Sequence, residues 1–296
     1  MMKKDLFVGA ATALITPFAN GKVDYAAFGK LIDWQIEEGI AALVIAGTTG
    51  EASTLDDAEH RAVISYAVKR VAGRVPVIAG AGSNDTAYAV SMAKFCAEAG
   101  ADGLLLVTPY YNKATQRGLI ESFSAIADAA ALPSIVYNVP SRTGCNILPE
   151  TAAVLAEHEW IWGIKEASGN ISQIAETARL TEGKMTLYSG NDDQILPVLS
   201  LGGKGVISVL SNVFPARTQA ICRNWFEGKF DLAMQEQLRL LPLVKALFSE
   251  VNPIPVKSAM AHLGFCENSL RLPLTQMDKA KEEVLLSEMR KEGLKV

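Results

Sequence analysis

The sequence predicts an α/β protein, a (β/α)₈ TIM barrel with a C-terminal helical subdomain. Two observations predict the barrel: eight short apolar runs rich in β-branched residues recur along the chain, and segments with helical periodicity separate them. A third observation predicts the subdomain, because only helical patterns follow the last apolar run. We place the catalytic barrel at 1–225 and the helical subdomain at 226–296.

The eight apolar runs are continuous rather than alternating, which is typical of parallel strands that are covered on both faces. We expect strands at Phe7–Thr16, Ala41–Ala46, Val75–Ala79, Leu104–Thr108, Ser134–Asn138, Trp160–Lys165, Met185–Ser189 and Val206–Leu210. The first run also resembles the apolar part of a signal peptide that begins at Met1. Asp5 interrupts its entry and an Asn20-Gly21 turn follows it, so we expect a strand.

Helical patterns follow the strands. Apolar residues recur at helical spacing after Asp24, and Asp56 with Glu59 forms a capping-box pattern before the next helix. In the tail we expect helices at Asp231–Leu247, Pro255–Leu263 and Gln276–Arg290, packed on the barrel or on a neighbouring subunit. A doubly wound open sheet is the competing fold. It would place a glycine fingerprint after the first strand, and residues 16–21 do not supply one.

Composition excludes several classes of partner. Lys and Arg number 28 against 32 Asp and Glu, a net charge of −4 without a basic run, so we expect no nucleic acid and no anionic membrane surface as partner. No apolar stretch reaches the length of a membrane span. The four cysteines lie far apart, which indicates a reducing compartment; we expect a cytoplasmic protein.

In a barrel of this kind the active site lies at the carboxyl ends of the strands. Lys165 ends an apolar strand there, where desolvation lowers a lysine pKa and provides a neutral amine for a Schiff base. A lone lysine more often reaches solvent or pairs with a neighbour such as Glu166. Its place opposite Tyr137 and the Thr48-Thr49 loop favours the nucleophile.

Other strand ends supply further polar groups. The glycines of Gly47-Thr48-Thr49-Gly50-Glu51 would free the backbone for a tight turn, and its hydroxyls could hold a small carboxylate. Tyr137 could exchange protons at Lys165 through hydroxyls of Thr48 and Tyr111, although each tyrosine could simply be a packed aromatic. Arg142 could bind a substrate carboxylate or form a structural ion pair.

Cofactor and metal signatures are missing from the sequence. His60, His158 and His262 show no metal-ligand spacing, so we expect no metal. The glycines around Gly80 and Gly202 lack the spacing of phosphate-binding loops, and we expect no cofactor.

Four motifs together resemble the 4-hydroxy-tetrahydrodipicolinate synthase (dihydrodipicolinate synthase) family of pyruvate-dependent class I aldolases. They are Gly47-Thr48-Thr49-Gly50-Glu51, Val107-Thr108-Pro109-Tyr110-Tyr111-Asn112, Tyr137-Asn138-Val139-Pro140-Ser141-Arg142-Thr143-Gly144 and Gly163-Ile164-Lys165-Glu166-Ala167. The resemblance runs from Gly9 to about Leu272. It implies a Schiff base between Lys165 and pyruvate, whose enamine attacks aspartate semialdehyde at the start of the diaminopimelate route to lysine.

The resemblance also implies the roles of single residues. Tyr137, Thr48 and Tyr111 would form a proton relay, with Tyr111 supplied by a partner subunit in a tetramer built from dimers. Thr49 would bind the pyruvate carboxylate, and Arg142 the carboxylate of the second substrate. The backbone of two further residues would line the pyruvate pocket, namely Gly190 and Ile207.

Two alternatives remain at this stage. N-acetylneuraminate lyase and related sugar-acid aldolases share the lysine, the tyrosine and the Gly-Thr-Thr-Gly loop, and Arg142 favours the dipicolinate branch over them. The second alternative is a non-catalytic metabolite-binding barrel, since a fold alone does not fix function.

Feedback inhibition by lysine is expected to be weak or absent. The family binds lysine in a cleft at a subunit interface, where the sequence retains Asn84, Tyr110 and His60. Asp57 replaces a histidine there, and Tyr88 replaces an acidic residue that would pair with the ammonium group of lysine.

Overall fold

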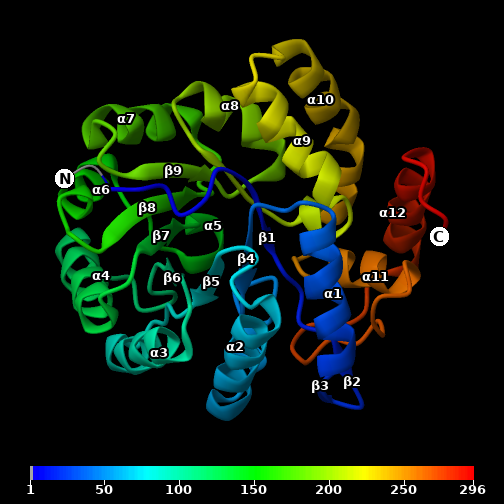
Figure 1. The fold of residues 1–296 in the computed structure, drawn as a ribbon, viewed down its shortest axis with the longest axis horizontal. Coiled ribbons are helices and arrows are strands. Elements are labelled where there is room, and N and C mark those ends of the chain that lie inside the picture. The colour runs from blue at the N-terminus through cyan, green and yellow to red at the C-terminus, as the bar shows by residue number, and fades with distance from the viewer. Residues whose placement is uncertain (1–2) are drawn as a thin grey trace.

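The computed structural model describes residues 3–296 and contains a closed barrel of eight parallel strands, which confirms the predicted fold (Figure 1). Each predicted run overlaps one strand. The strands are β1 Gly9–Ala13, β4 Ala42–Ile45, β5 Val77–Gly80, β6 Gly103–Val107, β7 Ser134–Asn138, β8 Ile161–Glu166, β9 Thr186–Ser189 and β10 Gly205–Ser208. Strands β4 to β10 follow one another around the barrel in sequence order, and β1 closes it between β10 and β4.

The first strand is shorter than predicted. β1 ends at Ala13, and the chain turns into a small hairpin of β2 Phe18–Ala19 and β3 Lys22–Val23. Asn20 and Gly21 form its turn with φ of 51° and 75°, a left-handed backbone that suits these two residue types. Met1 and Met2, where the signal-peptide alternative begins, lie outside the described residues.

Helices surround the barrel and alternate with its strands. They are α1 Tyr25–Glu37, α2 Asp57–Val71, α3 Thr86–Ala99, α4 Gln116–Ala130, α6 Pro149–Ala156, α7 Ile171–Thr181, α8 Ile195–Ser200 and α9 Pro215–Phe226. The predicted caps are present: Asp24 accepts from the amides of Ala26 and Ala27, and Asp56 with Glu59 completes a capping box. A short extra helix, α5 Pro140–Thr143, follows β7 and carries Arg142.

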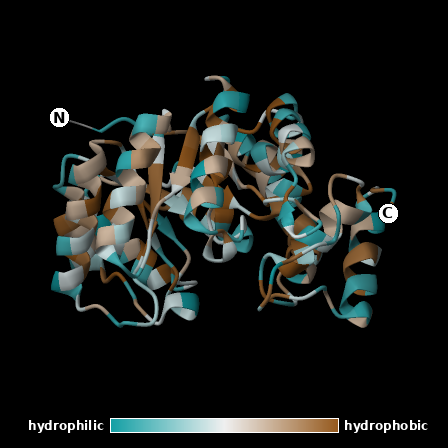
Figure 2. Cartoon of the chain, turned by 90° about the horizontal axis from the view of Figure 1, so that it is seen from below, coloured by the Kyte–Doolittle hydropathy of each residue, from teal (hydrophilic) through white to brown (hydrophobic). Residues whose placement is uncertain are grey.

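Apolar side chains fill two layers. One cluster lies between the strands and the outer helices, and a smaller cluster fills the barrel interior with residues such as Ala11, Val44, Ile78 and Ile135. Figure 2 shows brown strands inside and teal mostly on the outer helix faces. Among the described residues the interior of the barrel is therefore packed, so we expect a ligand to bind at one of its ends.

The tail is helical, as predicted. It comprises α10 Phe230–Leu247, α11 Ile254–His262 and α12 Lys279–Lys291. α10 packs on α9, and α12 lies on α10 and α11 at the edge of the molecule (Figure 1). The last helix begins three residues later than predicted, because the Asp278 side chain caps it by accepting from the amides of Ala280 and Lys281.

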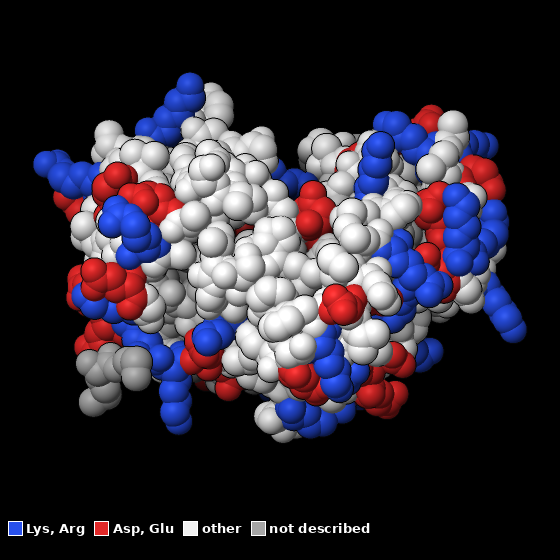
Figure 3. Space-filling view, turned by 90° about the horizontal axis from the view of Figure 1, so that it is seen from above, with Lys and Arg blue, Asp and Glu red and all other residues white. Residues whose placement is uncertain are grey.

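Charges of both signs are mixed around the periphery of the face in Figure 3, with an uncharged area in the middle. The described residues on that face therefore form no extended basic patch. Among residues 3–296, none of the helices has the length and apolar content needed to cross a bilayer.

Candidate active site

A cavity of about 410 Å³ lies at the carboxyl ends of the barrel strands. It gathers six of the eight predicted site residues: Thr48, Thr49, Tyr137, Arg142, Lys165 and Gly190. The tail contributes the segment 248–252 to the same wall, so the helical subdomain takes part in the site. This contribution was not predicted.

Lys165 points into this cavity from β8. Its side chain is buried, with 6% of the residue exposed, and within the described chain its Nζ has no hydrogen bond or ion pair. The pKa of Lys165 is lowered to about 7, chiefly by burial; the carboxylate of Asp192 opposes this shift, and the positive charge of Arg142 adds to it. A large share of the amine is therefore neutral near pH 7.

The neighbouring Glu166 faces away from the cavity. Because side chains alternate along a strand, it lies behind the barrel wall, where it accepts hydrogen bonds from Asn138 Nδ2 and the amide of Ser168. An ion pair between Lys165 and Glu166 is therefore absent, and this structural alternative for the lysine does not hold.

Tyr137 lies beside Lys165, as predicted. The two residues are register partners on β7 and β8, and Nζ lies 4.1 Å from the centroid of the phenol ring. Burial raises the pKa of Tyr137 to about 12, partly offset by Arg142. The phenol therefore stays protonated at neutral pH and needs a partner to pass its proton on.

The other two relay residues differ in position. Thr48 lines the cavity and is exposed. Tyr111 is 89% exposed and does not line the cavity of its own chain. A single chain thus brings Tyr137 and Thr48 together but not Tyr111.

Ile207, like Tyr111, does not line the cavity. It is buried in β10 and belongs to the same interior cluster as Tyr137. Gly190 does line the cavity, and a Cβ atom there would lie 2.7 Å from Ala167 Cβ and 3.2 Å from Lys165 Cε. Glycine at this position leaves the lysine side chain its space.

The loop after β4 turns by a different means than predicted. The left-handed residues are Ala46 and Glu51, with φ of 52° and 54°, and not the two glycines. Gly50 packs closely, since a Cβ there would lie 3.1 Å from the Leu14 carbonyl oxygen. Thr16 Oγ1 donates to the Gly50 carbonyl at 2.7 Å and holds this approach.

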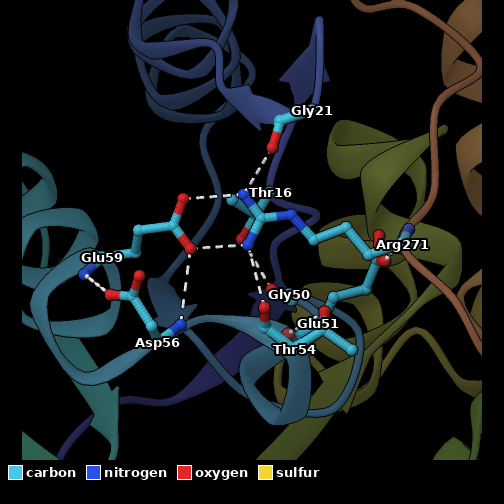
Figure 4. A network of polar contacts seen from close by, with 8 residues as sticks. All are labelled: Thr16, Gly21, Gly50, Glu51, Thr54, Asp56, Glu59 and Arg271. Carbon is cyan, nitrogen blue, oxygen red and sulfur yellow. Dashed lines mark hydrogen bonds and ion pairs between the residues drawn. The ribbon is translucent and has the colours of Figure 1, made fainter.

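Glu51 anchors the loop to the tail. Its Oε1 lies 2.5 Å from Lys257 Nζ, with both side chains fully buried, and Oε2 accepts from the amide of Arg271. Arg271 in turn forms a two-bond ion pair with Glu59, which Figure 4 shows beside the loop. No pattern in the sequence predicts this anchor.

Thr49 and Arg142 meet a tail residue that sequence reasoning missed. Asn252 Nδ2 donates to Thr49 Oγ1 at 2.9 Å, and Arg142 Nη2 donates to the Asn252 carbonyl at 3.0 Å. Within residues 3–296, Arg142 has no ion pair with an acidic residue, so its charge is not neutralised by a structural partner. The only local signal for Asn252 was an Asn-Pro turn pattern.

The three histidines lie apart and have individual partners: His60 contacts the Gly80 carbonyl, His158 lies near Asp128, and His262 near Glu282. Among the described residues, no group of three or more His, Cys, Asp or Glu side chains could hold a metal ion.

These features define a class of protein, a barrel enzyme with a desolvated lysine in the cavity at the carboxyl ends of its strands. The model of the dihydrodipicolinate synthetase family matches residues 6–291, and the chain belongs to this family.

Curated relatives are similar over their whole length. A 4-hydroxy-tetrahydrodipicolinate synthase of Lachnoclostridium phytofermentans is 54% identical, with 98% of this chain and 99% of the relative covered. One of Alkaliphilus oremlandii is 52% identical, with 98% and 100% covered. Among solved structures, dihydrodipicolinate synthase of Aquifex aeolicus is 46% identical, with a TM-score of 0.96 over 97% of this chain and 99% of that one.

Proposed function

We propose that this chain condenses pyruvate with L-aspartate 4-semialdehyde to give 4-hydroxy-tetrahydrodipicolinate, in lysine and diaminopimelate biosynthesis. The observation that carries the proposal is Lys165, an unpaired amine with a lowered pKa inside the cavity. The names of relatives at 50–54% identity support the same reaction.

In the proposed reaction the neutral Nζ of Lys165 attacks the C2 carbonyl of pyruvate, and loss of water gives an imine. Loss of a proton from C3 gives an enamine, which attacks the aldehyde carbon of the second substrate. The amino group of that substrate then attacks the imine carbon. The new carbon–nitrogen bond closes the ring as the bond to Lys165 breaks.

Proton transfers are assigned to Tyr137, Thr48 and Tyr111. The place of Tyr137 beside Lys165 supports its role. Its raised pKa keeps the phenol protonated, so Tyr137 would donate a proton and then be reprotonated through the other hydroxyls. Tyr111 can join only from a second copy of the chain, since it is exposed and outside its own cavity. We therefore propose a homo-oligomer, a tetramer built from dimers, in which the dimer completes the site.

Substrate binding is assigned to the remaining residues. Thr49 would bind the pyruvate carboxylate, and Arg142 at the cavity mouth that of the semialdehyde. The backbone of Gly190, which lines the cavity, would line the pyruvate pocket; the same role for Ile207 rests on the family resemblance alone, because Ile207 lies outside the cavity lining. We also propose a barrel unit at 1–225 and a helical unit at 226–296, and a cytoplasmic location.

A direct assay tests the proposal. Purified chain is incubated with pyruvate and L-aspartate 4-semialdehyde, and in parallel with N-acetylneuraminate, and products are identified by mass spectrometry. We expect the ring product and no cleavage of the sugar acid. Cleavage without condensation would favour the lyase, and neither reaction would favour a binding protein; the synthase names of the relatives favour neither alternative.

A further inference from the structure

Asn252 lies between α10 and α11 and reaches the cavity from the helical tail. Only 6% of the residue is exposed, and it lies in the wall that also contains Thr49 and Arg142. It contacts these two residues with different atoms. Its side-chain amide donates to Thr49 Oγ1, whereas its backbone carbonyl accepts from Arg142.

The side chain has no other partner in the described part of the chain. Its Oδ1 is buried without a hydrogen bond, and no side-chain bond caps the start of α11. The amide therefore does not cap α11. Its one hydrogen bond goes to a residue assigned to substrate binding.

The direction of this bond constrains the Thr49 hydroxyl. A hydroxyl has one hydrogen to donate and two lone pairs that accept. Because the amide of Asn252 occupies a lone pair, the hydrogen of Thr49 is free to point elsewhere. Within residues 3–296 the Thr49 hydroxyl donates to no protein group, and the residue lines the cavity.

We propose that Asn252 is a positioning residue that fixes the Thr49 hydroxyl as a hydrogen-bond donor toward the carboxylate of pyruvate. This inference rests on the proposed function, which assigns that carboxylate to Thr49. Asn252 contacts Arg142 through its backbone carbonyl. A change of the Asn252 side chain therefore affects the hydrogen bond to Thr49 and leaves the contact with Arg142 in place.

Two variants test the inference by steady-state kinetics. Asn252→Ala removes the amide and should raise the KM for pyruvate about tenfold, the value of one hydrogen bond to a charged group. The KM for aspartate semialdehyde should stay within about twofold, because the backbone contact with Arg142 remains. Gln276→Ala is the control, since it also removes a side-chain amide from the tail, and that amide donates to the Asn268 carbonyl outside the cavity.

Asn252→Asp gives the sharper comparison. The carboxylate has the shape of the amide but can only accept, so it turns the Thr49 hydrogen toward itself and adds a charge that repels pyruvate. The KM for pyruvate should therefore rise more than in Asn252→Ala, roughly a hundredfold. A merely structural role would make the isosteric variant the milder one.

A double variant shows whether the effect passes through Thr49. Thr49→Val should itself raise the KM for pyruvate, and adding Asn252→Ala should change it by less than about twofold further. Fully multiplied effects would overturn the inference, as would a KM for pyruvate unchanged in both Asn252 variants or a milder effect of Asn252→Asp. A wild-type chain that does not use pyruvate would overturn the proposed function as well, and is recognised before any variant is made.

Discussion

Lys165 and Tyr137 face each other across two adjacent strands, with the lysine Nζ 4.1 Å from the centroid of the phenol ring. Neither group has another polar partner in the described part of the chain, so both remain available to a ligand in the cavity. Strand register places them, because residues paired in a parallel sheet on the same face point the same way.

The pKa of Lys165, lowered by burial to about 7, predicts a pH dependence for imine formation. The reactive neutral amine dominates above this pKa and is lost by protonation below it. We expect the initial rate of imine formation at low pyruvate concentration to rise about tenfold from pH 6 to pH 8 and then to level off. A rate that keeps rising steeply to pH 10 would contradict this. Arg142→Gln should shift the profile to higher pH, because Arg142 helps to lower the lysine pKa.

Removing the phenol hydroxyl of Tyr137 should slow proton transfer while leaving the lysine in place. Tyr137→Phe is expected to lower kcat roughly 10²–10⁴-fold, the usual contribution of general acid–base catalysis. Tyr188→Phe is the matched control, since that hydroxyl donates to the Phe7 carbonyl away from the cavity. Equal kcat values for both variants would argue against a role of Tyr137 in proton transfer.

The buried pair of Glu51 and Lys257 should matter for stability. Lys257→Met leaves the Glu51 carboxylate buried without its partner, and we expect a loss of about 3–5 kcal/mol in the free energy of unfolding. Urea denaturation measures it. Lys184→Met, which removes an exposed pair with Glu157, should change stability little. A similar loss in the free energy of unfolding for both variants would show that the buried pair stabilises the fold no more than an exposed pair does.

Lysine is expected to inhibit weakly or not at all. His60, Tyr88 and Tyr110 do line a second cavity of about 460 Å³ beside the first. Asp57 is paired with Arg61 at 2.8 Å, so its charge is already compensated. Inhibition measured at low lysine concentration would contradict the prediction. Tyr88→Glu restores a carboxylate and should increase the sensitivity to lysine.

Much of the barrel and of the site could be predicted from the sequence, because both depend on local patterns. Lys165 and Tyr137 end neighbouring apolar strands, and parallel strands bring such ends to one rim. The turn after β4 was assigned to the wrong residues, since Ala46 and Glu51 adopt the left-handed backbone that glycine usually takes.

Contacts made by the tail could not be predicted. Asn252 bonds to Thr49 across 203 positions, and Lys257 pairs with Glu51 from α11. No periodic pattern relates a loop between helices to a strand end so far away in the chain. Which partner the side chain of Asn252 or Lys257 contacts follows only from the packed structure.

The most direct measurement is borohydride reduction of the chain in the presence of pyruvate, followed by mass spectrometry of the peptide that contains Lys165. The lysine of this peptide should gain the mass of one reduced pyruvate adduct, and Lys165→Ala should gain none anywhere. An unmodified Lys165 in chain that turns over pyruvate, or an adduct on a different lysine, would contradict the account.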